Sequence, residues 1–61
     1  MPLISIRLRA GRSTEQLADL VAAVSQAAAD TLDAPLERVG VHIFELDDRH
    51  VGRGGRLAAA D

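Results

Sequence analysis

The stretch STEQLADLVAAVSQAAADTL, residues 13–32, decides the fold because it carries both the start signal and the periodicity of a helix. Ser13, followed three positions later by Gln16, forms a capping box, in which each side chain accepts a hydrogen bond from the other residue's backbone N–H. Apolar or helix-compatible side chains then recur at helical spacing, at Leu17, Leu20, Val21, Val24, Ala28, Thr31 and Leu32. The pattern predicts one helix over residues 14–32. The helix should end at Asp33-Ala34-Pro35, because the residue before a proline avoids helical backbone angles.

Short alternating segments lie on both sides of the predicted helix. Before it, one set of side chains is apolar and the other mostly charged: Ile4, Ile6 and Leu8 against Ser5, Arg7 and Arg9. After it, Val39, Val41 and Ile43 alternate in the same way with Gly40, His42 and Phe44. A period of two is the pattern of a strand with one buried face. Two strands joined by a helix form a βαβ unit with parallel strands and a right-handed crossover in about 98% of cases. We therefore expect an α/β (α+β) chain.

The segment HVGRGGRL, residues 50–57, is rich in glycine and predicts a turn or a small C-terminal hairpin. Arg53 stands between glycines, as an anion-binding residue does in a phosphate-cradling loop. The helix that such a loop requires does not follow, so a turn is the preferred interpretation. Together with the βαβ unit, this segment predicts a single domain over residues 1–61.

A chain of 61 residues has a small core. It buries only about 60% of the surface of its unfolded form, and such chains usually depend on disulfides, a metal or a partner subunit. The sequence contains no cysteine, which excludes disulfides and thiolate metal sites, and His42 and His50 lack the spacing of a metal-binding pair. One helix can cover only one face of a two-stranded sheet, and Leu3 and Phe44 lie on the other. We therefore expect self-association without a metal.

The charge pattern excludes several classes of function. The net charge is −2, with acids and bases interspersed, so the basic stripe of a nucleic-acid-binding protein is missing. A single aromatic residue provides no base-stacking platform. No apolar run approaches the ~20 residues of a membrane span, and the start of the chain lacks the pattern of a secretion signal. We expect a cytoplasmic protein that binds neither nucleic acid nor membrane.

Pro2 is a candidate for chemistry because it directly follows Met1. A small second residue permits removal of the methionine, which would leave a free secondary amine at the start of a strand. Such an amine is a candidate general base or nucleophile. An α-amino group ordinarily has a pKa of about 7.7–8.0. Position alone favours the simpler interpretation that the proline only begins a strand.

Four motifs stand in one order along the chain: PLISI (2–6), GRS (11–13), LDAPL (32–36) and HVGRGG (50–55). Their combination resembles the 4-oxalocrotonate tautomerase family over nearly the whole chain. The resemblance implies a tautomerase-like βαβ subunit with a C-terminal hairpin. It implies assembly as dimers within a homohexamer, a trimer of dimers, and an amino-terminal proline that moves protons. No metal or organic cofactor is implied.

The resemblance also implies roles for individual residues of this chain. Pro2 corresponds to the catalytic base. Arg12, from a neighbouring subunit, corresponds to the loop arginine that binds a substrate carboxylate and draws electron density. Arg9 corresponds to the residue whose backbone N–H meets the substrate. Val51 falls where the family has a pocket-wall phenylalanine, so this wall is smaller and less aromatic.

One departure from the family pattern concerns the second arginine, which would fall at Gly40. Arg38 is two positions away, displaced by roughly 6–7 Å along a strand. Either it takes part of the missing role or it points into solvent. His42 shares the predicted face of Gly40 and could hydrogen-bond a substrate there, although a solvent-facing side chain is the preferred interpretation. With one end of the pocket lacking a cation, we therefore expect a dicarboxylate to gain little over its monocarboxylate counterpart.

These patterns predict an isomerase: a tautomerase that moves a proton in a small enol or keto acid, with Pro2 as general base. One alternative uses Pro2 in a hydration, a dehalogenation or a biosynthetic rearrangement. An alternative of another class is a non-catalytic oligomeric binding protein that keeps only the fold.

Overall fold

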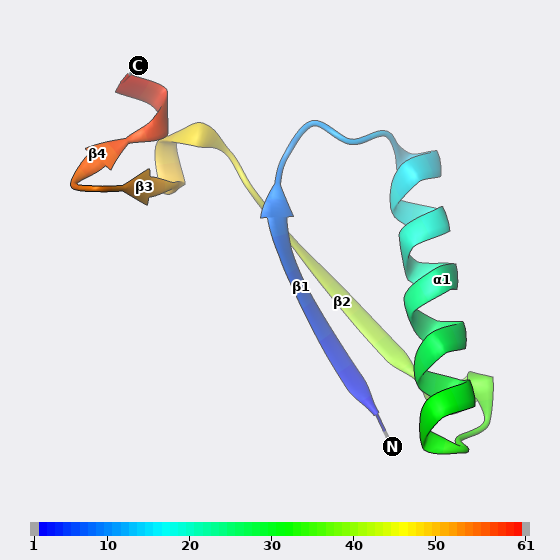
Figure 1. Ribbon diagram of the computed structural model, residues 1–61. Helices are drawn as coiled ribbons and strands as arrows, with labels where there is room; N and C mark the ends of the chain where they lie inside the picture. The colour runs from blue at the N-terminus through cyan, green and yellow to red at the C-terminus, as the bar shows by residue number, and fades with distance from the viewer. Residues whose placement is uncertain (1, 61) are drawn as a thin grey trace.

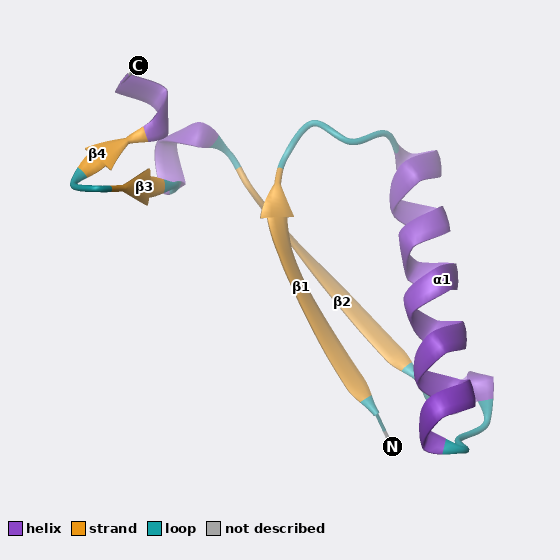
Figure 2. Ribbon diagram, viewed as in Figure 1, coloured by secondary structure: helices purple, strands orange, loops and turns teal. Residues whose placement is uncertain are grey.

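The computed structural model describes residues 2–60, which form one βαβ unit followed by a small hairpin (Figure 1). The elements are β1 (Leu3–Arg9), α1 (Thr14–Leu32), β2 (Gly40–Leu46), β3 (Gly52–Arg53) and β4 (Arg56–Leu57). Single-turn 3-10 helices occupy Leu36–Arg38, Asp48–His50 and Ala58–Ala60. Figure 2 shows the two small sheets, β1–β2 and β3–β4, joined by one of these turns. The expected fold class is confirmed.

Helix α1 has the predicted bounds, and local hydrogen bonds explain them. The Gln16 N–H donates to Ser13 Oγ at 3.1 Å, and the Ser13 N–H donates to Gln16 Oε1 at 3.0 Å, so the capping box is complete. At the other end, Asp33 adopts the left-handed conformation with φ of 55°. The backbone N–H groups of Asp33 and Ala34 both donate to the Ala29 carbonyl, which closes the last turn. The left-handed aspartate therefore stops the helix before the proline does.

Strands β1 and β2 are parallel and fully paired, from Leu3 opposite Gly40 to Arg9 opposite Leu46. Burial alternates along β1 as predicted, with Ile4, Ile6 and Leu8 partly buried and the residues between them exposed. β2 begins one residue later than the predicted alternation. Val39 instead closes the preceding 3-10 turn, its N–H donating to the Leu36 carbonyl at 3.1 Å. Leu3 and Gly40 lie on the other face of the sheet from Ile4, Ile6 and Leu8.

That second face of the β1–β2 sheet is uncovered in the single chain. Leu3 is 64% exposed and Phe44 is 45% exposed. The Arg7 guanidinium lies 5.5 Å from the centre of the Phe44 ring and provides only partial cover. Among residues with a described burial, Ser25 and Ala29 alone are buried, and neither is completely shielded from solvent. A core this small agrees with the expectation that other copies of the chain cover the sheet.

The hairpin lies far from α1, beyond the end of the β1–β2 sheet (Figure 1). The chain measures 44 × 23 × 13 Å, with a radius of gyration of 14.7 Å. A compact chain of this length would have a radius of gyration of about 10.5 Å. The hairpin therefore projects from the βαβ unit instead of packing on it. No helix within residues 2–60 has the length and apolar character needed to cross a membrane.

Candidate active site

Pro2 lies at the N-terminal end of β1, beside the first residue of β2. The Gly40 N–H donates to the Pro2 carbonyl oxygen at 2.9 Å, and Leu3 is paired with Gly40 in the sheet. Pro2 is half-buried. Backbone hydrogen bonding therefore fixes the position of Pro2 without help from side chains. Met1, whose removal is expected to expose the Pro2 amine, lies outside the described residues.

Gly40 provides close packing at this end of the sheet, where the family pattern led us to look for a second arginine. A Cβ at position 40 would lie 3.1 Å from Leu3 Cδ1, which is tighter than an ordinary contact. Arg38 ends the neighbouring 3-10 turn and is exposed, with its backbone N–H donating to the Pro35 carbonyl at 2.9 Å. Its side chain makes no hydrogen bond or ion pair with any residue from 2 to 60. Arg38 is thus a free surface cation within the described chain.

Arg9 and Arg12 lie at the opposite, C-terminal end of β1. Arg12 Nη1 donates to the Arg9 carbonyl oxygen at 2.8 Å. The Arg9 guanidinium pairs with the Asp48 carboxylate, and both side chains are more than half exposed. Gly11, between the two arginines, has a φ of 126°, a backbone angle that glycine readily supplies. The loop therefore folds Arg12 back onto the end of the strand.

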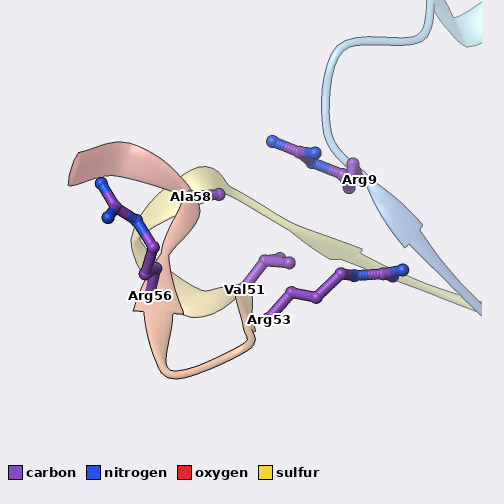
Figure 3. Close-up of a pocket in the computed structure, with 5 residues that line it drawn as sticks. All are labelled: Arg9, Val51, Arg53, Arg56 and Ala58. Atoms are coloured by element: carbon purple, nitrogen blue, oxygen red, sulfur yellow. The ribbon is translucent and has the colours of Figure 1, made fainter. Parts of the chain in front are cut away.

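An open pocket of about 360 Å³ lies between this end of β1 and the hairpin (Figure 3). Its lining residues are Arg9, Val51, Arg53, Arg56 and Ala58. The Ala58 N–H donates to the Val51 carbonyl at 2.8 Å and closes the far side of the hairpin. Arg9 and Val51 were singled out separately from the sequence, and the structure brings them to the same pocket. Arg53 and Arg56 were missed as pocket residues, since only a turn was assigned there.

Pro2 and Arg38 are remote from that pocket within the chain. Strand β1 begins directly after Pro2 and ends seven residues later at Arg9, a span of roughly 20 Å or more. Figure 1 shows the N-terminus and the hairpin at opposite ends of the strand. The structure therefore places Arg12 against Arg9, and Arg9 with Val51 in the pocket, but separates these residues from Pro2. One chain does not assemble the expected site.

His42 lies between the two ends of the sheet. It pairs with Ser5 in the register, on the same face as Gly40, and it is exposed. This placement confirms the predicted face. It also fits a solvent-facing side chain in the isolated chain better than a substrate ligand.

The chemical capacity of the two ends differs. The pocket end offers guanidinium groups beside a small apolar wall, which suits an anion. Between Pro2 and Ala60, no group of three or more histidine, aspartate or glutamate residues is placed to hold a metal ion. The pocket lining consists of arginine, valine and alanine, none of which is an ordinary general acid or base, so Pro2 is the candidate that the sequence offers for proton transfer.

Comparison with known proteins identifies the family. The family model described as tautomerase enzyme matches residues 2–60. A 2-hydroxymuconate tautomerase from Pseudomonas sp. (strain CF600) is 46% identical over 59 residues, covering 97% of this chain and 94% of that protein. The crystal structure of an apo unfused 4-OT shares 43% identity, with a TM-score of 0.89 over 98% of each chain. A heterohexameric 4-oxalocrotonate tautomerase from Chloroflexus aurantiacus J-10-fl shares 44% identity, with a TM-score of 0.89 over 97% of this chain and 95% of that one.

The match covers both ends of β1 and the hairpin, so it includes every element that carries a candidate site residue. Identity above 40% over nearly the full length agrees with the shared fold. The resemblance inferred from four short motifs is confirmed, and so is the expectation of an isomerase. The chain belongs to the tautomerase family.

Proposed function

We propose that this tautomerase shifts a proton within a small conjugated enol or keto acid, with the Pro2 amine as base. The neutral amine takes a proton from the enol form, and the electron pair of that bond moves into the conjugated system. The resulting ammonium returns the proton to a carbon further along, which gives the keto isomer and restores the amine. No group other than Pro2 needs to change its protonation state.

Arg12 of a neighbouring copy is proposed to bind the substrate carboxylate. A guanidinium matches a carboxylate with two parallel hydrogen bonds and remains charged at any working pH. In the same position it draws electron density toward the carboxylate end of the substrate. It also stabilises the negative charge that develops on the substrate as the proton passes to Pro2. The Arg9 backbone N–H and the Val51 side chain are assigned to the same end of the substrate.

The observation that carries this proposal is the separation of Pro2 from the arginine end by the length of β1. A substrate of a few carbon atoms cannot span it, so a complete site requires the Pro2 end of one copy and the arginine end of another. The uncovered face at Leu3 and Phe44 supports such association. So does the heterohexameric assembly of the Chloroflexus relative. We propose a homohexamer, built as a trimer of dimers, in which every site is shared.

The substrate class is proposed from the Pseudomonas relative, a 2-hydroxymuconate tautomerase. 2-Hydroxymuconate is a conjugated six-carbon enol with a carboxylate at each end. An enol acid of this kind presents a proton for the amine and an anionic end for Arg12. It is the first compound to assay.

Complementation between two inactive variants tests the shared site. Pro2→Leu puts a large residue after Met1, which keeps the methionine and removes the proline amine. Arg12→Ala removes the proposed carboxylate ligand. Each chain alone should be strongly impaired, whereas co-refolding them in equal amounts should restore about a quarter of the wild-type activity, since each residue is intact in half of the chains of a symmetric oligomer.

The control is the same mixture prepared without unfolding, in which subunits have not exchanged and activity should stay low. If co-refolded chains never exceed the sum of the two variants, the site lies within one chain and the proposal fails.

A further inference from the structure

We propose that Arg53 is the second substrate-binding cation of this enzyme and takes the carboxylate that Arg12 does not hold. The inference rests on the proposed function, because it names the group that recognises the other end of the same substrate. The expectation of an open pocket end rested on Gly40, with Arg38 and His42 as the residues that could compensate. The structure adds Arg53, on the hairpin, as a further arginine at the pocket.

The hairpin sets the backbone position of Arg53. Gly54 and Gly55 form a two-residue turn with φ of 62° and 79°, the positive angles that tight hairpins favour. The turn pairs Arg53 directly with Arg56 across the two strands. The register gives Arg53 a defined place on the hairpin, two positions after Val51, which also lines the pocket.

Arg53 differs from the other pocket arginines in its surroundings. The Arg9 guanidinium is already paired with Asp48. Figure 3 shows the Arg56 side chain extending from the opposite side of the hairpin, away from Arg9. Arg53 extends past Val51 toward the β1–β2 sheet in the same view, and it makes no hydrogen bond or ion pair with residues 2–60. Arg53 is therefore the pocket cation within the described chain whose charge has no internal partner.

Arg53 also belongs to the same half-site as Arg12. The Arg12 side chain binds the Arg9 carbonyl, and the Arg9 side chain lines the pocket together with Arg53. A copy that presents Arg12 to a neighbour's Pro2 therefore brings Arg53 with it. Two separated guanidinium groups suit a substrate with two separated anionic groups, whereas one suffices for a monocarboxylate. Arg53 would thus replace the cation that Gly40 lacks, from a different element of the fold.

The test compares kcat/KM for 2-hydroxymuconate with that for its analogue in which hydrogen replaces the distal carboxylate. A hydrogen bond to a charged group corresponds to about ten- to a hundredfold in affinity or rate. Wild type should prefer the dicarboxylate by that factor, and Arg53→Gln should lose the preference while keeping its rate on the monocarboxylate. Arg53→Lys should keep part of the preference. Arg49→Gln is the matched control, because Arg49 is an exposed arginine of the adjacent turn that does not line the pocket.

Unreactive ligands separate this inference from the proposed reaction. Binding of adipate and hexanoate, measured by calorimetry, does not depend on turnover. If wild type converts neither enol, the proposed function fails. Loss of adipate binding in Arg53→Gln but not in Arg49→Gln would still establish the cation site. If Arg53→Gln keeps the dicarboxylate preference in both assays, or Arg49→Gln loses it equally, Arg53 is not the second cation.

Discussion

The two ends of β1 are built in different ways. At the Pro2 end, the backbone provides the structure: the Gly40 N–H holds the Pro2 carbonyl, and a glycine lets Leu3 pack closely. At the arginine end, contacts of exposed side chains provide the structure: the Arg12 side chain binds the Arg9 carbonyl, and the Arg9 side chain pairs with Asp48. The proposed base is held at the start of the sheet, while Arg12 and Arg53 lie on elements outside the β1–β2 sheet.

This difference suits the separate tasks of a proton-transfer site. A base must stand within hydrogen-bond distance of the proton it moves, and a small displacement is costly. Charge recognition is more tolerant of position, because a long arginine side chain can adjust. Substrate choice can therefore change through residues outside the β1–β2 sheet, such as those at positions 12 and 53, while Pro2 stays in place. The variants below should separate chemistry from recognition.

The largest effect is expected from blocking the Pro2 nitrogen. A form that retains Met1 has an amide at this position, which is not a base, so kcat/KM should fall by about 10²–10⁴, the usual contribution of a general base. Pro2→Ala keeps a primary amine and should retain partial activity. Mass spectrometry of the intact chain reports whether Met1 is present, and the enol acid assay measures the rate.

The pH profile gives an independent check on the base. The amine must be unprotonated to accept a proton, so kcat/KM should rise with pH through one ionisation. An α-amino group ordinarily titrates at about pH 7.7–8.0. Full activity in the form that retains Met1 would exclude Pro2 as the base, whatever the shape of the profile.

A smaller effect is expected at the arginine end. Arg12→Ala removes a charge-assisted hydrogen bond worth roughly 1.5–3 kcal/mol, so kcat/KM for an acidic substrate should fall at least about tenfold. Arg38→Ala should cost much less, because the exposed Arg38 side chain is assigned no contact with the carboxylate that Arg12 binds. Steady-state kinetics on the two variants compares them directly. An equal or larger loss in Arg38→Ala would mean that Arg38, and not the pocket end, holds the carboxylate.

Local sequence patterns predicted the elements of the fold because local interactions determine them. The Ser13 and Gln16 side chains cap α1 within one turn, and alternation in β1 sets its buried face. The start of β2 was placed one residue early, since Val39 satisfies the period of two but bonds back to Leu36 in a 3-10 turn. The family motifs were specific in combination, which allowed the family to be inferred from residues spread along the whole chain.

The pocket was harder to predict because it depends on the path of the chain between distant elements. Arg9 and Asp48 are 39 positions apart, and their pairing follows from the turn after β2, which the sequence does not specify. Arg53 was assigned to a turn by comparison with phosphate-binding loops, yet it reaches a pocket completed by β1. One signal was available: two arginines that flank a Gly-Gly pair become register partners in a two-residue hairpin.

The smallest effect on activity is expected from the cap of α1, which lies next to the arginine end. Ser13→Ala removes the hydrogen bond from the Gln16 N–H and should lower the free energy of unfolding by about 1 kcal/mol. Because Ser13 directly follows Arg12, a loosened cap should also disturb the loop, so kcat/KM should fall slightly but less than in Arg12→Ala.

Gln16→Ala is the matched control, since it removes the reciprocal bond from the other side of the same capping box. Denaturant unfolding at one fixed protein concentration measures the stability of both variants, because assembly makes stability concentration-dependent. If Ser13→Ala lost as much activity as Arg12→Ala with unchanged stability, the arginine end would be held by the helix cap, and the contrast between the two ends of β1 would be wrong.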